Sequence, residues 1–191
     1  MKELNLGFLA SHGGSNMQAI INEIKEGKLS GVAARCVISN NSSSLALDRA
    51  RREGIPAFHI SSAQFPDETS LSKAIIDTFD EFGVNVVILA GYMKKLPTSV
   101  INHFDGRVLN IHPALLPKFG GEGMYGTRVH EAVITSGEKT SGATIHVVND
   151  QFDSGRILAQ MSVPVLPDDS ADTLALRVLS VEHVLYADTL R

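Results

Sequence analysis

The sequence predicts an α/β fold: a Rossmann-like, mostly parallel sheet with helices on both faces and an antiparallel pair of strands near the C-terminus. In residues 4–112, short apolar segments alternate with amphipathic segments of helical period, which is the order of a parallel sheet with crossover helices. After residue 140, two apolar segments are separated only by "NDQFDS" (149–154), and so short a connection indicates antiparallel strands. The 191 residues fit one domain with a sizeable core.

Local patterns assign the elements of the first half. From Met17 to Ile24 the apolar residues recur at helical spacing and stop before Gly27, which predicts a helix over 15–27. The clearest buried strand is 85–90, because it is apolar and β-branched without alternation. By the same reasoning we expect further strands at 4–10, 32–39, 55–60 and 106–112, and helices at 43–54 and 67–83.

The second half has a different pattern. Its antiparallel strands are expected at 142–148 and 155–165. A last helix over 170–190 carries apolar residues at helical spacing, and its Glu182 and His183 are expected to be exposed. The apolar residues of this helix are Leu174, Val178, Val181 and Leu185. No element is assigned to residues 113–141.

Composition excludes several classes of protein. The net charge is −4 and no basic run occurs, so nucleic acid is not an expected partner. The one cysteine, Cys36, excludes a disulfide framework within the chain and any Cys-based zinc site, and its apolar surroundings indicate a buried structural thiol. The N-terminal segment lacks a long apolar stretch, and no segment reaches 18 apolar residues. We therefore expect a cytoplasmic protein that does not interact with membranes.

Open α/β sheets bind ligands beyond the carboxyl ends of their strands, and polar residues and glycines gather at those places. One is "SHGGSN" (11–16), where glycines and the start of a helix suit an anion such as phosphate. The alternative is a plain helix N-cap after a flexible turn. The segment matches neither GxGxxG nor a P-loop, and no acidic residue ends the second strand, so dinucleotide binding is disfavoured.

A second place is "AGYMKKLP" (90–97), which follows the most buried strand. Tyr92, Met93 and Leu96 could line a flat apolar pocket, with Lys94 or Lys95 near an acidic ligand. The alternative is an ordinary turn in which Pro97 starts a helix.

The third place combines an amide, an imidazole and carboxylates. Asn110 and His112 are two residues apart on an extended segment, so their side chains face the same way, and Pro113 keeps His112 out of a helix. This pair suits oxyanion stabilisation with proton donation. Asp150 or Asp153 could orient the imidazole and raise its pKa, although both could equally be turn residues.

Two kinds of chemistry are not indicated. No Ser or Cys stands in a nucleophile elbow, which suggests that the substrates react directly with one another. The other histidines form no metal-ligand spacing, so no metal is expected. These are His103, His130, His146 and His183.

The segments "GSN", "VILAGYMKKL", "LNIHPALLPKFGG", "GATIHVVNDQFDSGRIL" and "EHVLY" stand in the order found in phosphoribosylglycinamide formyltransferases, and the chain resembles that family over essentially its whole length. The resemblance implies the formyltransferase fold in a single domain, 1–191, with a Rossmann-like phosphate-binding half (1–100) and a catalytic and folate-binding half (101–191). It implies direct transfer of the formyl group of 10-formyltetrahydrofolate to glycinamide ribonucleotide, through a tetrahedral intermediate, in de novo purine biosynthesis.

The resemblance also implies residue roles. His112 would donate a proton, Asn110 would hold the formyl oxygen, and Asp153 would raise the pKa of His112. The nucleotide would be bound by Gly14, Ser15, Asn16 and Glu182. The folate would be bound by Met93, Lys94, Lys95, Leu96, Asn110, Asn149, Asp150, Gln151, Phe152 and Asp153. The chain departs from the family's usual pattern at His12, Glu68 and Lys94.

Three alternatives stay open. A 10-formyltetrahydrofolate hydrolase shares this core but usually carries an extra N-terminal domain. A methionyl-tRNA formyltransferase adds a basic C-terminal domain, for which there are no residues here. A non-catalytic folate- or nucleotide-binding module would not need Asn110, His112 and Asp153 together. The expected partners are the two substrates, and the protein is expected to be a monomer or a homodimer.

Overall fold

In the computed structural model, which describes residues 3–191, seven strands are hydrogen-bonded in the order β3-β2-β1-β4-β5-β6-β7. The predicted mostly parallel sheet with an antiparallel C-terminal pair is confirmed. The chain divides into two compact units, one ending at Leu109 and the other beginning at Asn110. Strand β5 (Val108–His112) starts in the first unit and continues in the second.

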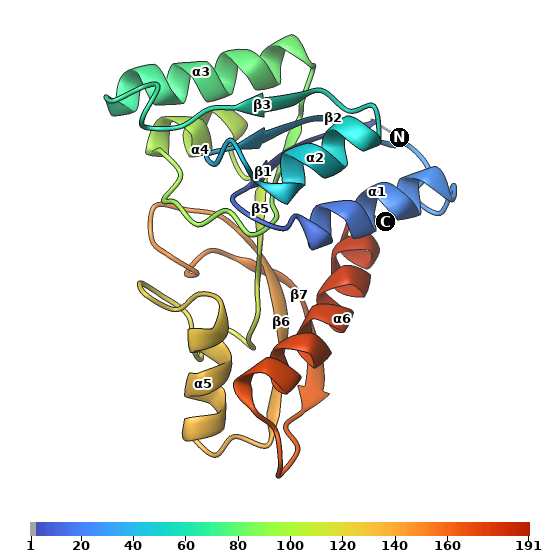
Figure 1. Cartoon of the computed structure of the whole chain (residues 1–191), viewed down its shortest axis with the longest axis vertical. Coiled ribbons are helices and arrows are strands. Elements are labelled where there is room, and N and C mark those ends of the chain that lie inside the picture. The colour runs from blue at the N-terminus through green and yellow to red at the C-terminus, as the bar shows by residue number, and fades with distance from the viewer. Residues whose placement is uncertain (1–2) are drawn as a thin grey trace. The chain divides into compact units, whose positions relative to one another are not determined.

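The first unit is the Rossmann-like part. Its strands are β1 (Leu4–Ala10), β2 (Val32–Ser39), β3 (Ala57–His59), β4 (Val86–Leu89) and the start of β5. Its helices are α1 (Ser15–Lys25), α2 (Leu45–Arg52), α3 (Glu68–Glu81) and α4 (Thr98–Phe104). Strand β1 pairs in parallel with β2 and β4, and β2 pairs in parallel with β3. Helices α1 and α2 cover one face of these strands, and α3 and α4 cover the other (Figure 1).

Polar side chains cap the starts of helices α2 and α3. The Ser44 side chain accepts a hydrogen bond from the Leu47 N–H at the start of α2. The Asp67 side chain accepts a hydrogen bond from the Ser70 N–H at the start of α3. Helix α1 differs, because its N-cap is Gly14, which provides no side-chain cap. The first turn of α1 also contains no acidic residue, so nothing on the helix itself offsets the positive end of its dipole.

The second unit contains the end of β5, helix α5 (Thr127–Thr135), strands β6 (Thr140–Val147) and β7 (Ile157–Pro164), and helix α6 (Ala171–Leu190). Strands β6 and β7 pair antiparallel. Helix α6 packs against both strands and against α5 (Figure 1). A capping box, formed by Ser170 and Thr173, starts α6.

Helix α5 is the element that the sequence patterns do not indicate. It starts after Gly126, without a side-chain cap, in a segment rich in glycine. Several of its residues are β-branched, and these have low helix propensity. Its buried Val129, His130 and Val133 show that tertiary packing, rather than local preference, stabilises this helix.

Other expectations can be compared directly with the structure. Cys36 is buried, and burial raises the pKa of its thiol to about 12, which confirms a structural thiol.

Glu182 was expected to be exposed, and this is wrong, because only 7% of it is exposed. It follows the buried Val178 by four residues and therefore lies on the buried face of α6. No helix within residues 3–191 is long and apolar enough to cross a membrane.

Candidate active site

In the first unit, the carboxyl ends of three strands are joined through Ser11, which is 1% exposed. Its hydroxyl donates to Asn40 Oδ1 (2.6 Å) after β2 and accepts from the Met93 N–H (2.8 Å) after β4. Its own N–H donates to the Gly91 carbonyl (3.0 Å). The predicted phosphate loop (11–16) and the 90–97 segment therefore meet at the same edge of the sheet.

The phosphate loop passes close to helix α2. Gly14 has φ +67, and a Cβ at this position would lie 2.8 Å from the Cβ of Ala46. Both the left-handed conformation and the close approach require glycine. The next residues, Ser15 and Asn16, form the first turn of α1, with Asn16 buried. The backbone of the loop and the uncapped start of α1 therefore lie together, and this arrangement suits the binding of an anion.

The 90–97 segment places its residues in different surroundings. Tyr92 is half-buried, and burial raises the pKa of its phenol to about 12. Met93 is 41% exposed and Lys94 and Lys95 are exposed, so these three side chains can reach a ligand. Leu96 is 4% exposed and contributes to the core instead.

In the second unit, His112 and Asp153 form a buried pair. His112 Nδ1 lies 3.3 Å from Asp153 Oδ2, with 4% and 10% of the two side chains exposed. His112 Nε2 lies 2.7 Å from the carbonyl oxygen of Phe119, which can only accept, so Nε2 carries a hydrogen. The sequence could not decide between Asp150 and Asp153, and the structure selects Asp153 as the neighbour of His112.

Backbone geometry around Asp153 holds its carboxylate in place. Asp153 has φ +52 and Phe119 has φ +57, both unusual for residues with a side chain. The Gly121 N–H donates to Asp153 Oδ2 (3.1 Å). A Cβ on Gly120 would lie 2.5 Å from Leu116 and 3.1 Å from the Cβ of Asp153. The 119–121 turn therefore contacts both His112 and Asp153, a role that its sequence does not indicate.

Asn110 is oriented by a residue absent from the predicted site, His146. Asn110 Nδ2 lies 3.1 Å from His146 Nε2, and His146 Nδ1 lies 3.1 Å from the Val147 carbonyl. Since the carbonyl only accepts, Nδ1 carries the hydrogen, and Nε2 accepts from Asn110. His146 Nε2 also lies 3.4 Å from Asp153 Oδ1. The signal in the sequence is a histidine between the apolar Ile145 and Val147 of β6, at a position that turns out to be 2% exposed.

Burial and ion pairing shift the pKa of His112 in opposite directions. Burial lowers the pKa of His112 the most, and neighbouring His146 lowers it too. Asp153 and the hydrogen bond to Phe119 raise it, but the net pKa lies below the ordinary value. Asp153 therefore acts in the predicted direction and raises the pKa of His112, but desolvation lowers that pKa by more.

Asp153 itself stays ionised. Burial raises its pKa, but a protonated His146, a protonated His112 and the Gly121 N–H together outweigh that effect, so the pKa lies below its ordinary value. A buried carboxylate that remains charged can support a positive charge on the neighbouring imidazole.

The remaining predicted site residues of this unit lie on the 149–152 turn and on α6. Asn149 shapes the turn, because its Oδ1 accepts from the Gln151 N–H (3.1 Å) and the Ser154 hydroxyl (3.0 Å). Asp150 and Gln151 are exposed, and Phe152 is 47% exposed. Glu182 is buried on α6. Burial raises the pKa of the Tyr186 phenol, and the nearby Glu182 raises it further.

The buried histidines predict a loss of stability in acid. Burial lowers the pKa of His112 and of His130 below the ordinary 6.5, so below that pH the unfolded chain binds more protons than the folded chain. The free energy of unfolding should therefore fall as the pH decreases from 6.5. Urea denaturation between about pH 7.5 and pH 5 measures this. His130→Gln should reduce this dependence of the free energy of unfolding on pH. His12→Gln, at an exposed position, is the control and should leave it unchanged. The same pH dependence in His130→Gln as in the wild-type protein would show that His130 does not contribute.

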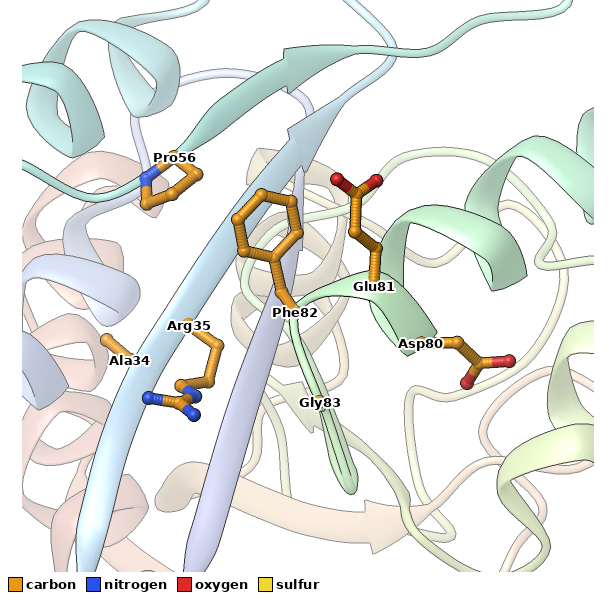
Figure 2. Close-up of a pocket in the computed structure, with 7 residues that line it drawn as sticks. All are labelled: Ala34, Arg35, Pro56, Asp80, Glu81, Phe82 and Gly83. Atoms are coloured by element: carbon orange, nitrogen blue, oxygen red, sulfur yellow. The ribbon is translucent and has the colours of Figure 1, made fainter.

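The first unit also has a surface hollow of about 570 Å³, toward the amino ends of β2 and β3. It is lined by Ala34, Arg35, Pro56, Asp80, Glu81, Phe82 and Gly83 (Figure 2). Most of these residues are exposed, and none belongs to the predicted site. Within residues 3–191, no group of three or more His, Cys, Asp or Glu side chains is arranged to hold a metal ion.

Known proteins resemble this chain closely. It is 43% identical over 188 residues to a chloroplastic phosphoribosylglycinamide formyltransferase of Vigna unguiculata. The aligned residues make up 98% of this chain and 60% of the relative. It is 36% identical over 183 residues to the phosphoribosylglycinamide formyltransferase of Escherichia coli (strain K12), which covers 96% and 84%. The crystal structure of glycinamide ribonucleotide transformylase 1 from Symbiobacterium toebii matches with a TM-score of 0.92 at 35% identity, over 99% of this chain and 86% of that chain.

The chain spans less than two thirds of the length of the plant relative. A family model described as formyl transferase matches residues 4–190, nearly the entire chain. That match includes every residue of the His112, Asp153 and Asn110 cluster and of the loop at 11–16. The chain therefore belongs to the formyl transferase family.

Proposed function

We propose that this protein transfers the formyl group of 10-formyltetrahydrofolate to the amine of glycinamide ribonucleotide, a step of de novo purine biosynthesis. The proposal depends above all on the buried contact between His112 Nδ1 and Asp153 Oδ2 (3.3 Å), in the same unit as the oriented Asn110 amide. Simple binding of a nucleotide or a folate needs no such combination of proton donor, carboxylate and amide. The names of the relatives supply the choice of substrates.

Asn110 and His112 act on the formyl oxygen. As the amine of the nucleotide attacks the formyl carbon, a new C–N bond forms and negative charge develops on that oxygen. One N–H of Asn110 is held by His146, and the other is available to donate to this charge. The Nε2 hydrogen of His112 changes its acceptor from the Phe119 carbonyl to the formyl oxygen.

His112 also carries the proton that completes the reaction. The bond between the formyl carbon and N10 of the folate breaks, and the proton lost by the attacking amine ends on N10. Asp153 opposes the effect of burial on His112, so it maintains a protonated fraction of the imidazole. Because no protein nucleophile takes part, the contribution of the protein is positioning, charge stabilisation and proton transfer.

The proposal also includes the residues that would bind each substrate. Gly14, Ser15 and Asn16 bind the phosphate of the nucleotide, and Glu182 binds its glycinamide part. The exposed Met93 and Phe152 have the apolar surface that a pterin ring needs, and the exposed Lys94 and Lys95 suit an acidic tail. Leu96 supports this segment from the core. The backbone and polar groups of 149–153 provide the remaining folate contacts.

The acceptor can be tested directly. Purified protein is mixed with 10-formyltetrahydrofolate, and loss of the formyl group is followed by absorbance with and without glycinamide ribonucleotide. We expect deformylation only when the ribonucleotide is present. Deformylation that does not need it would indicate that water is the acceptor, as in a 10-formyltetrahydrofolate hydrolase. Absence of turnover in both reactions would contradict both functions. The cytoplasmic location and the monomer or homodimer remain predictions.

A further inference from the structure

Helix α2 holds two successive carbonyls of the phosphate loop. The Ala46 N–H donates to the carbonyl of His12 (3.0 Å), and Arg49 Nε donates to the carbonyl of Gly13 (3.0 Å). A trans peptide is planar, with its C=O and the following N–H pointing in opposite directions. The N–H groups of Gly13 and Gly14 therefore point away from α2. These two contacts decide which side of the loop can present N–H donors to an anion.

Among the residues that the structure describes, no carboxylate pairs with Arg49. Arg51 pairs with Asp48 (2.9 Å) on the same helix, and Lys25 pairs with Glu53 (2.7 Å). Arg49 forms no ion pair with any residue in 3–191, although its side chain is half-buried against the loop. A guanidinium that is partly removed from water without a carboxylate partner favours a nearby anion.

We propose that Arg49 is a positioning residue for phosphate binding, and this inference rests on the proposed function. Through its bond to the Gly13 carbonyl, Arg49 keeps the loop in the conformation that presents backbone N–H groups to the phosphate. Its uncompensated positive charge adds to the positive end of the α1 dipole at the same loop. The bound group is a phosphate monoester, and Arg49 has no part in the formyl transfer itself.

This role predicts a specific kinetic pattern. Arg49→Ala should raise the KM for glycinamide ribonucleotide by about 10- to 100-fold, the range expected for loss of a hydrogen bond to a charged group. The kcat and the KM for 10-formyltetrahydrofolate should change by less than about two-fold, because the lost interaction is the same in the ground state and the transition state. Arg49→Lys keeps the charge and an N–H donor and should recover part of the affinity.

The matched control is Arg52→Gln. Arg52 is an exposed arginine on the same helix, and its replacement removes the same charge without touching the loop. Thermal melting of all variants reports whether the fold is intact. A rise in KM for the nucleotide in Arg49→Ala but not in Arg52→Gln supports the inference. An unchanged KM for the nucleotide in Arg49→Ala would overturn the inference. A fall in kcat as large as the rise in this KM, together with a lower melting temperature, would also overturn it.

Calorimetric titration with glycinamide ribonucleotide, and separately with inorganic phosphate, separates this inference from the proposed function. If the wild-type protein binds these probes without catalysing transfer, and Arg49→Ala loses the binding, then the phosphate role stands and the transferase function fails. If the wild-type protein catalyses transfer and the variant binds both probes normally, then only the role of Arg49 fails. If the wild-type protein neither binds nor turns over, both are wrong.

Discussion

Asp153→Asn is expected to lower kcat by roughly 10²–10⁴-fold, the usual contribution of general acid–base catalysis. The asparagine can still accept the hydrogen bond from the Gly121 N–H, so the turn should persist. It has no negative charge, however, and the interaction that raises the pKa of His112 is lost. Burial then lowers that pKa further, and a smaller fraction of His112 is protonated at neutral pH.

The dependence of kcat on pH should also change in a defined direction. A proton donor loses activity as the pH rises through its pKa, so kcat of the wild-type protein should decline on the alkaline side of that pKa. In Asp153→Asn the decline should move to lower pH. The measurement is kcat against pH for both proteins, with Asp168→Asn as the control because Asp168 is exposed. A profile in Asp153→Asn that coincides with the wild-type profile would rule out the coupling between Asp153 and His112.

Asn110→Ala is expected to lower kcat by about 10²–10³-fold, the typical effect of removing one oxyanion donor. The KM values for both substrates should change little, because this donor acts mainly on charge that develops in the transition state. Steady-state kinetics with each substrate varied in turn measure this. Loss of affinity with an unchanged kcat would indicate that Asn110 binds the ground state and would contradict the oxyanion role.

A control and a second variant sharpen this test. Asn102→Ala removes an exposed amide from α4 and should leave the kinetics unchanged. His146 should act through Asn110, because its Nε2 accepts from the Asn110 amide. A His146→Ala change should therefore cost much less in the Asn110→Ala background than in the wild-type protein. Additive effects of the two changes on kcat would show that His146 acts through Asp153 or His112 instead of through Asn110.

Most of the fold could be predicted because its elements have strong local signals. The apolar run at 85–90, the helical spacing from Met17 to Ile24 and the short 149–154 connection each indicate one type of structure. Helix α5 has no such signal, since its residues favour other conformations and only packing of its buried face stabilises it. The same limit applies to Glu182, whose burial depends on what α6 packs against.

The sequence by itself determined the chemistry available to this protein, namely an amide and an imidazole two residues apart after a strand, carboxylates in a later turn, and a glycine-rich start of a helix. Only the tertiary structure decided which of these groups interact. It placed Asp153 rather than Asp150 beside His112, brought His146 to Asn110, and set Arg49 against the Gly13 carbonyl. It also decided the direction of the pKa shift at His112, because desolvation depends on every element packed around a group, which local sequence does not specify.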